Sequence, residues 1–216
     1  DMYEKRIRPY QERIFGLLEL SPAIRSPVAA APRGPLKGEI EFANVWFAYE
    51  GEEWVLRDCS FRVAPGERVA IVGATGEGKS TIAKLINRSY DVSRGRLSLD
   101  GVDVREWELT NLRRQVGVIL QDLFLFSGTV EGNLRLGNGH VSREVMERAV
   151  EMANARAFIA ALPRGYQEEV RERGANFSQG QRQLLAIARA LVYDPAVLIL
   201  NEATSSVDPE SEAMIQ

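Results

Sequence analysis

The sequence has little of what disulfide bonds, membrane spans and nucleic-acid binding require. It holds one cysteine among 216 residues, so an internal disulfide is impossible and a reducing compartment is expected. No apolar run approaches the ~18 residues that suggest a membrane span, and no apolar stretch follows the N-terminus as in a signal peptide. The 27 basic residues are outnumbered by 30 acidic ones, so no overall basic field favours nucleic acid.

The length of the chain and its N-terminal pattern predict one domain with an appendage in front of it. Apolar residues recur at helical spacing within residues 1–20, which predicts an amphipathic helix. They are Tyr3, Ile7, Tyr10, Ile14 and Leu17. Residues 26–38 are rich in proline and glycine and are interpreted as a linker. The helix either packs on the domain behind it or arrives from another domain. A start at Asp1 rather than Met suggests part of a longer protein.

From residue 39 the hydrophobic pattern changes to the alternation that is typical of strands. Strands are predicted around 40–47, 54–56, 61–63 and 96–99. The apolar runs at 116–120 and 196–200 have the length of strands buried in a parallel sheet. Helical patterns fill residues 129–162 and begin again at Ser178, where Ser178 and Gln181 form a capping box. The alternation predicts an α/β fold with a mostly parallel core sheet, preceded by antiparallel strands.

One glycine-rich stretch carries the clearest chemistry. It runs Gly73-Ala74-Thr75-Gly76-Glu77-Gly78-Lys79-Ser80-Thr81. The apolar segment 68–72 predicts a strand before it, and residues 82–86 predict a helix after it. In that context the glycines let the backbone wrap around phosphates, which the loop amides and the helix N-terminus attract. Lys79 is expected to reach the β- and γ-phosphates, and the Ser80 hydroxyl to bind Mg²⁺. A glycine loop with an incidental lysine is the alternative, which the flanking pattern disfavours.

Further motifs follow in an order and spacing that resemble the nucleotide-binding domain of ABC transporters, most closely the exporter type. They are Gln121 at the end of an apolar run, Phe177-Ser178-Gln179-Gly180-Gln181, Leu198-Ile199-Leu200-Asn201-Glu202 and Ser205-Ser206-Val207-Asp208. These motifs resemble the Q-loop, the signature, Walker B and the D-loop of that family, and the glycine-rich stretch resembles Walker A. Residues 122–130 and 162–174 resemble segments of exporters in particular. The resemblance covers about residues 39–216.

The resemblance implies ATP and Mg²⁺ as ligands. Lys79, Gln121 and Glu202 would be catalytic, with Glu202 polarising the attacking water. Ser80, Gln121 and Asn201 would hold the Mg²⁺ ion. A glutamate after a buried strand is also a common strand-end residue, so the role of Glu202 depends on the family context.

The remaining implied contacts bind the nucleotide. Its phosphates would lie on residues 73–81. Tyr49 would stack on adenine, although an aromatic residue in a strand is by default a packing residue. Ser178, Gly180 and Gln181 would contact ATP held by a second nucleotide-binding domain, in a homodimer or a heterodimer. Ser178 is a helix N-cap under either interpretation.

The family architecture implies a P-loop NTPase core with a mostly parallel sheet, an N-terminal antiparallel β-subdomain and an inserted helical subdomain at about 122–175. Residues 1–38 would be the helix and linker that follow a transmembrane domain, and 39–216 the ATP-binding domain at the cytoplasmic face of the cell membrane. A histidine that contacts the γ-phosphate would follow beyond Gln216, so the C-terminal part of the domain is expected to be missing.

Three residues depart from the family pattern, namely Glu77 in the phosphate loop, Gln179 in the signature and Asn201 in Walker B. Glu77 would place a carboxylate near the phosphates unless its side chain turns to solvent. Asn201 stands where an aspartate supports Mg²⁺, and it keeps the shape but loses the charge. The leading hypothesis is an ATP-hydrolysing motor domain of an exporter. A non-hydrolysing nucleotide switch is the second, which Gln179 and Asn201 favour and Glu202 opposes. A soluble ATPase acting on DNA or ribosomes is disfavoured by the exporter-like segments and the acidic balance.

Overall fold

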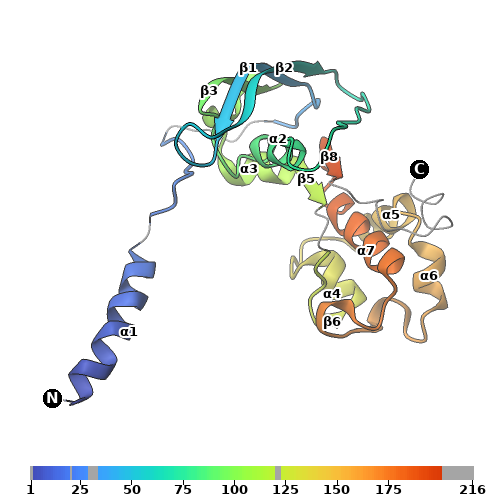
Figure 1. Cartoon of the computed structure of the whole chain (residues 1–216). Helices are drawn as coiled ribbons and strands as arrows, with labels where there is room; N and C mark the ends of the chain where they lie inside the picture. Colours follow the sequence, from blue (N-terminus) through green and yellow to red (C-terminus); the bar gives the residue numbers. More distant parts are fainter. Residues whose placement is uncertain (1, 20, 29–33, 120–122, 201–216) are drawn as a thin grey trace.

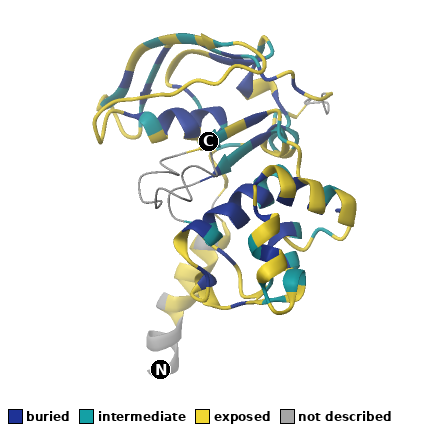
Figure 2. Cartoon of the chain, turned by 90° about the vertical axis from the view of Figure 1, so that its right-hand side faces the viewer, coloured by how far each residue is buried: buried dark blue, intermediate teal, exposed yellow. Residues whose placement is uncertain are grey.

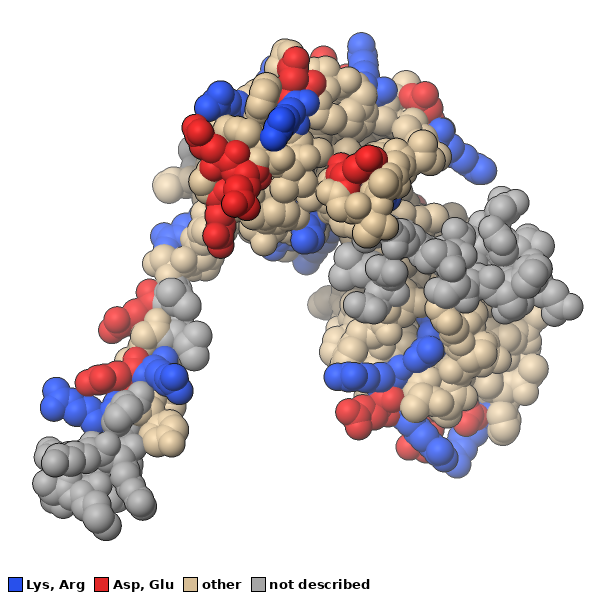
Figure 3. Space-filling view, viewed as in Figure 1, with Lys and Arg blue, Asp and Glu red and all other residues tan. Residues whose placement is uncertain are grey.

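The computed structural model describes residues 2–19, 21–28, 34–119 and 123–200. Figure 1 shows three parts in chain order: helix α1 (Met2–Leu18), a part rich in β-strands, and a helical part. Within the described residues no helix is both long and apolar enough to cross a bilayer. On the face drawn in Figure 3, basic side chains lie scattered beside acidic ones instead of gathering in one patch.

An antiparallel sheet forms one side of the β-rich part, as the sequence predicts. Its strand order is β2-β1-β3-β4, with β1 (Ile40–Ala48) paired to β2 (Trp54–Val63) and β3 (Arg94–Leu99), and β4 (Val102–Asp103) beside β3. Ile40 and Phe42 are buried before an irregularity at Asn44 (φ 49°), and Val45 and Phe47 are buried after it, so the bulge returns the alternation to the same face. The period-two pattern therefore places one face of β1 against the core.

Two helices cover the inner face of this sheet (Figure 1): α2 (Lys79–Ile86) and α3 (Leu109–Gln115). A hydrophobic core of buried residues lies between them, and Figure 2 shows that both the sheet and these helices carry buried residues. Leu85, Leu97, Leu99 and Leu112 are each fully buried there. Burial of each leucine side chain contributes about 1.5–3 kcal/mol, and this packing holds α2 against the sheet.

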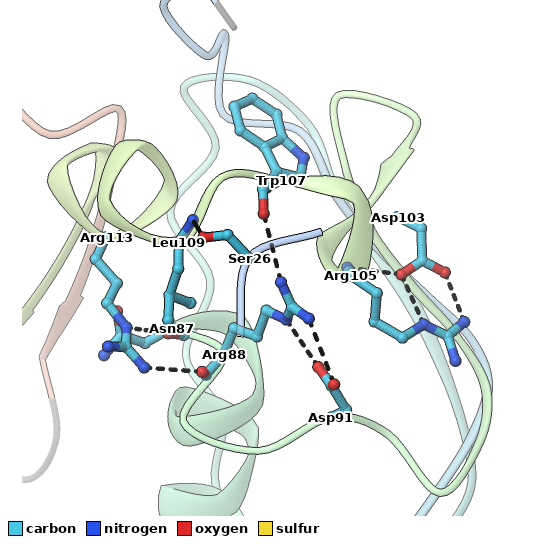
Figure 4. Close-up of polar contacts among 9 residues, drawn as sticks. All are labelled: Ser26, Asn87, Arg88, Asp91, Asp103, Arg105, Trp107, Leu109 and Arg113. Carbon is cyan, nitrogen blue, oxygen red and sulfur yellow. Dashed lines mark hydrogen bonds and ion pairs between the residues drawn. The ribbon is translucent and has the colours of Figure 1, made fainter. Parts of the chain in front are cut away.

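A polar cluster joins the end of α2 to the start of α3 (Figure 4). Buried Arg88 donates to Asp91 at 2.8 Å and to the Trp107 carbonyl at 3.4 Å. Arg113 of α3 donates to the Arg88 carbonyl at 3.0 Å. The short helix η1 (Val104–Glu106) directly precedes Trp107. Because carbonyls at the end of a helix have no partner within it, Arg113 stabilises the C-terminal end of α2.

The parallel part of the structure consists, among the described residues, of β5 (Val116–Ile119) and β8 (Val197–Leu200). The prediction of a strand over 68–72 was wrong for this structure: the segment has no regular secondary structure, and Val72 is 87% exposed. An apolar pattern raises strand propensity, but a strand forms only where a neighbour pairs with its backbone amides and carbonyls. No such ladder to 68–72 occurs within the part of the chain that the structure describes.

The helical part contains α4 (Val130–Arg135), α5 (Arg143–Met152), α6 (Arg156–Ala161) and α7 (Gln179–Leu191). Short elements link them, namely β6 (Gly128–Thr129), η2 (Gly165–Gln167), β7 (Glu169–Val170) and η3 (Glu172–Gly174). The helical run predicted for 129–162 is divided into three helices, because Leu136 and Asn154 adopt left-handed conformations with φ of 48° and 54°. Leu134, Met146, Ile159 and Leu185 belong to a second core.

The segment after α1 is attached to the domain more firmly than a free linker. The Ser26 hydroxyl accepts from the Leu109 amide at 2.9 Å (Figure 4). Leu36 is buried in the first core, and the Lys37 and Glu39 amides donate to Asp100 at 2.6 and 2.9 Å. Helix α1 itself projects away from the domain in Figures 1 and 2. The domain boundaries at 38 and at about 122–175 remain predictions.

Candidate nucleotide-binding site

The phosphate loop turns directly into α2, where the sequence predicts a helix. Gly76 and Gly78 have φ of +91° and +87°, a region that residues with side chains rarely adopt. A Cβ on Gly78 would also lie 2.8 Å from Leu56 Cδ2, so β2 excludes a side chain there. The first turn of α2 begins at Lys79 and contains no acidic residue. The N-terminus of this helix is therefore suited to an anion.

Lys79 lies over the start of the loop. Its Nζ donates to the carbonyl oxygens of Gly73 and Ala74, each at 2.7 Å. The ammonium group is thus held beside the loop by two neutral acceptors in an exposed position. A phosphate that enters the loop meets a cation with no carboxylate partner within 4 Å among the described residues.

Glu77 bends back into the loop. Its Oε2 accepts from the Ala74 amide at 2.8 Å, and the Glu77 amide donates to the Ala74 carbonyl at 3.3 Å. The sequence left two placements open for this side chain, beside the phosphates or turned to solvent. In the structure the carboxylate contacts the loop itself.

Tyr49 follows β1 and lies next to the phosphate loop, 42% exposed. Its hydroxyl is 3.0 Å from Thr81 Oγ1 and accepts from Lys84 Nζ at 3.3 Å. The rings of Phe47 and Tyr90 meet the Tyr49 ring nearly at right angles, with centroids 4.9 and 5.1 Å away. An exposed ring anchored beside the loop can stack on a base. The structure thus brings together the predicted base and phosphate residues.

Tyr90 and Lys84 are neighbours of Tyr49 that sequence reasoning missed. Lys84 lies one helical turn after Thr81 on α2, so the i, i+3 spacing could have pointed to it. Its Nζ is 5.1 Å from the centre of the Tyr49 ring. Tyr90 has no comparable signal, because only the tertiary fold brings the segment after α2 next to the end of β1.

The signature segment forms the N-terminus of α7, as predicted. The Ser178 hydroxyl accepts from the Gln181 amide at 3.2 Å, and the Gln181 side chain accepts from the Ser178 amide at 3.0 Å. This confirms the capping box. Gly180 is buried in the first turn. In Figure 1, α7 and α2 lie on opposite sides of β5 and β8, so the fold separates the signature from the phosphate loop within one chain.

Three predicted site residues, Gln121, Asn201 and Glu202, lie outside the described residues. Of the predicted Mg²⁺ ligands, Ser80 is described, in the first turn of α2. No cluster of three or more His, Cys, Asp or Glu side chains that could hold a metal occurs in the described ranges. A hydroxyl at the start of α2, beside a phosphate-binding loop, is the kind of oxygen ligand that Mg²⁺ uses together with substrate phosphates. The described residues therefore fit an Mg²⁺ ion that binds together with a nucleotide and takes phosphate oxygens as further ligands.

A groove of about 620 Å³ lies between α3 and β5 on one side and α7 on the other. Its apolar floor includes Val118 and Phe124, and three arginines line it, namely Arg113, Arg114 and Arg189. Arg189 donates to the Phe124 carbonyl at 2.9 Å, and burial lowers the pKa of its guanidinium. Sequence reasoning did not predict this groove, because its walls come from segments far apart in the chain.

The fold and the loop define a nucleotide-binding domain of the P-loop type. The family model of the ABC transporter matches residues 56–205. The chain belongs to the ABC transporter family, and its fold is that of the family's nucleotide-binding domain.

Several ABC transporter proteins contain a region similar to this chain. The chain is 44% identical over 206 residues to a putative multidrug export ATP-binding/permease protein of Bacillus subtilis, covering 95% of this chain and 36% of the relative. It is 46% identical over 207 residues to the ATP-dependent lipid A-core flippase of Vibrio vulnificus, covering 95% and 35%. The solved structure of a bacterial Atm1-family ABC exporter with ATP bound matches with a TM-score of 0.86 at 39% identity, over 95% of this chain and 36% of that chain. The chain thus spans about a third of the length of these relatives.

Proposed function

We propose that this chain is the ATP-binding and hydrolysing motor domain of an ABC exporter. The observation that carries the proposal is the placement of Tyr49 and Lys79 around one loop. The Tyr49 hydroxyl is 3.0 Å from Thr81 Oγ1, and Lys79 Nζ lies 2.7 Å from two loop carbonyls. A base-stacking ring and a phosphate-binding cation are therefore joined by the first turn of α2, which suits a nucleoside triphosphate.

In the proposed site, Lys79 and the amides at the start of α2 neutralise the charge of the transferring phosphoryl group. Glu202 would polarise the attacking water, and Gln121 would act in catalysis as a ligand of Mg²⁺. Ser80, Gln121 and Asn201 would hold Mg²⁺, which would supply positive charge to the phosphates of the bound nucleotide. A positioned general base contributes about 10²–10⁴-fold to the rate, so Glu202 accounts for much of the difference between a motor and a passive switch.

The site is proposed to be shared between two chains. Ser178, Gly180 and Gln181 at the start of α7 would complete the ATP site of a second nucleotide-binding domain arranged head to tail. The separation of α7 from α2 within one chain supports this arrangement (Figure 1). The second domain is either a copy of this chain or a related one.

A transmembrane domain is the other proposed partner, at the cytoplasmic face of the cell membrane. Helix α1 carries exposed Tyr10, Ile14, Phe15 and Leu18 while it projects from the domain. This exposure favours a connector to another part of the protein over a surface helix. The names of relatives that pair ATP binding with a permease support the same assignment. The mixed charge distribution of Figure 3 offers no basic patch on that face for nucleic acid.

A subunit-mixing experiment tests the proposed function. In the full-length protein, Lys79→Ala and Ser178→Arg should each abolish ATP hydrolysis. A mixed dimer keeps one site in which both residues are intact. Random mixing of the two variants should therefore restore up to about a quarter of the parental activity, because half of the dimers of a symmetric pair are mixed.

The control is Lys79→Ala mixed with a Lys79→Ala, Ser178→Arg double variant, in which every site lacks Lys79. It should stay inactive. If mixed dimers form but hydrolyse no ATP while the parent does, the shared site is wrong. If the parent binds ATP and dimerises without hydrolysing it, the non-hydrolysing switch replaces the motor.

A further inference from the structure

The Glu77 carboxylate occupies part of the loop that the proposed function assigns to phosphate. Its Oε2 accepts a hydrogen bond from the Ala74 amide at 2.8 Å. The same oxygen lies against Gly73, in the space that a Cβ at this position would occupy. The Glu77 carboxylate is thus folded onto the loop, where it accepts the hydrogen bond of the Ala74 amide.

The charges around Glu77 make this contact significant. Lys79 Nζ donates to the carbonyls of Gly73 and Ala74, so the cation and the carboxylate are attached to the same short segment. The first turn of α2 adds the positive end of a helix dipole and no acidic side chain. Glu77 thus places a negative charge in the positive region that attracts phosphate.

We propose that Glu77 sets the nucleotide affinity of this loop, because its carboxylate stands in for phosphate when the loop is empty and repels phosphate when nucleotide arrives. The inference rests on the proposed nucleotide-binding function. A like charge about 6 Å from a phosphate, in surroundings between water and protein, weakens binding about tenfold. The loop therefore binds ATP and ADP more weakly than it would without this charge.

The chain supplies a matched control in Glu67. Its Oε2 accepts from the Ala64 amide at 2.7 Å, and its amide donates to the Ala64 carbonyl at 3.1 Å. The contact has the same geometry as that of Glu77 but lies in the turn before the loop. A Glu67→Gln variant therefore loses the same charge and keeps the same kind of turn, outside the phosphate-binding stretch.

The test measures the dissociation constants of ATP, ADP and inorganic tripolyphosphate for the parent and for Glu77→Gln, Glu77→Ala and Glu67→Gln. Glutamine keeps an oxygen that can accept from the Ala74 amide, so Glu77→Gln removes the charge with little effect on the turn. Both Glu77 variants should bind all three ligands about tenfold more tightly at about 0.01 M salt. The gain should shrink at about 1 M salt, where the Debye length is about 3 Å. Glu67→Gln should match the parent.

Each outcome decides the point. Tighter, salt-sensitive binding in both Glu77 variants supports the inference. Unchanged or weaker binding in Glu77→Gln overturns it, since Glu77 is then neutral or supports the loop. A gain that is independent of salt also overturns it, because relief of a structural constraint would not be screened. If the parent binds none of the three ligands, or Lys79→Ala binds them as well as the parent does, the proposed function itself fails.

Discussion

Replacing Tyr49 separates its ring from its hydroxyl. In Tyr49→Phe the ring keeps its edge-on neighbours Phe47 and Tyr90 and loses only the hydroxyl contacts to Thr81 and Lys84. A hydrogen bond contributes about 0.5–1.5 kcal/mol, and at this half-exposed position we expect the lower end, or about a twofold loss of ATP affinity. Tyr49→Ala also removes the ring, and base stacking is worth about 1–3 kcal/mol. Tyr49→Ala should therefore lower the affinity for ATP about 5- to 150-fold.

The assay is displacement of a fluorescent ATP analogue by ATP and by inorganic tripolyphosphate, which has phosphates and no base. Tyr49→Ala should weaken ATP and leave tripolyphosphate within about twofold, because stacking involves the base alone. Equal weakening of both ligands would show that Tyr49 only supports the loop through Thr81. Unchanged ATP affinity in Tyr49→Ala would remove this residue from the site altogether.

Two further predictions concern magnesium and pH. In the full-length protein, Asn201→Asp should raise Mg²⁺-dependent phosphate release at least about tenfold, because substitutions of outer-shell residues typically change metal affinity or activity about 10- to 100-fold. Adding Glu202→Gln should abolish the gain. If neither the rate nor its Mg²⁺ dependence changes in Asn201→Asp, Asn201 does not limit the activity. Burial alone would raise the pKa of Asp103, but hydrogen bonds from Arg105 hold it below its usual value. The stabilisation by Asp103 is therefore complete above its unfolded pKa of about 3.9 and is lost as pH falls through the lower folded value. Asp103→Asn should lower the free energy of unfolding by about 1–2 kcal/mol at pH 7, and chemical denaturation near pH 3 should show a smaller difference from the parent; an equal difference at both pH values would contradict this.

Features that depend on hydrogen bonds between residues a few positions apart could be predicted from the sequence. The capping box joins Ser178 to Gln181, three positions away, so residue type and spacing are enough to predict it. The glycine-rich stretch and the helix after it follow the same logic, since Gly76 and Gly78 adopt backbone angles that other residues avoid. The period-two pattern likewise predicted strand β1, although not the bulge at Asn44. The family followed from the order and spacing of the motifs along the chain, which are properties of the sequence alone.

Contacts between segments far apart in the chain could not be predicted, because they depend on how the whole chain packs. Tyr90 lies beside Tyr49 only because α2 packs under the sheet, and no spacing along the chain encodes that contact. Residues 68–72 have the pattern of a strand but form none here, because strand formation depends on a partner elsewhere. Glu77 shows the same limit at short range: the sequence allowed its side chain to point toward the phosphates or toward solvent, and in the structure the side chain turns onto the amide of Ala74 in the phosphate loop. Propensity acts locally, whereas partners and side-chain directions depend on packing that the whole chain creates.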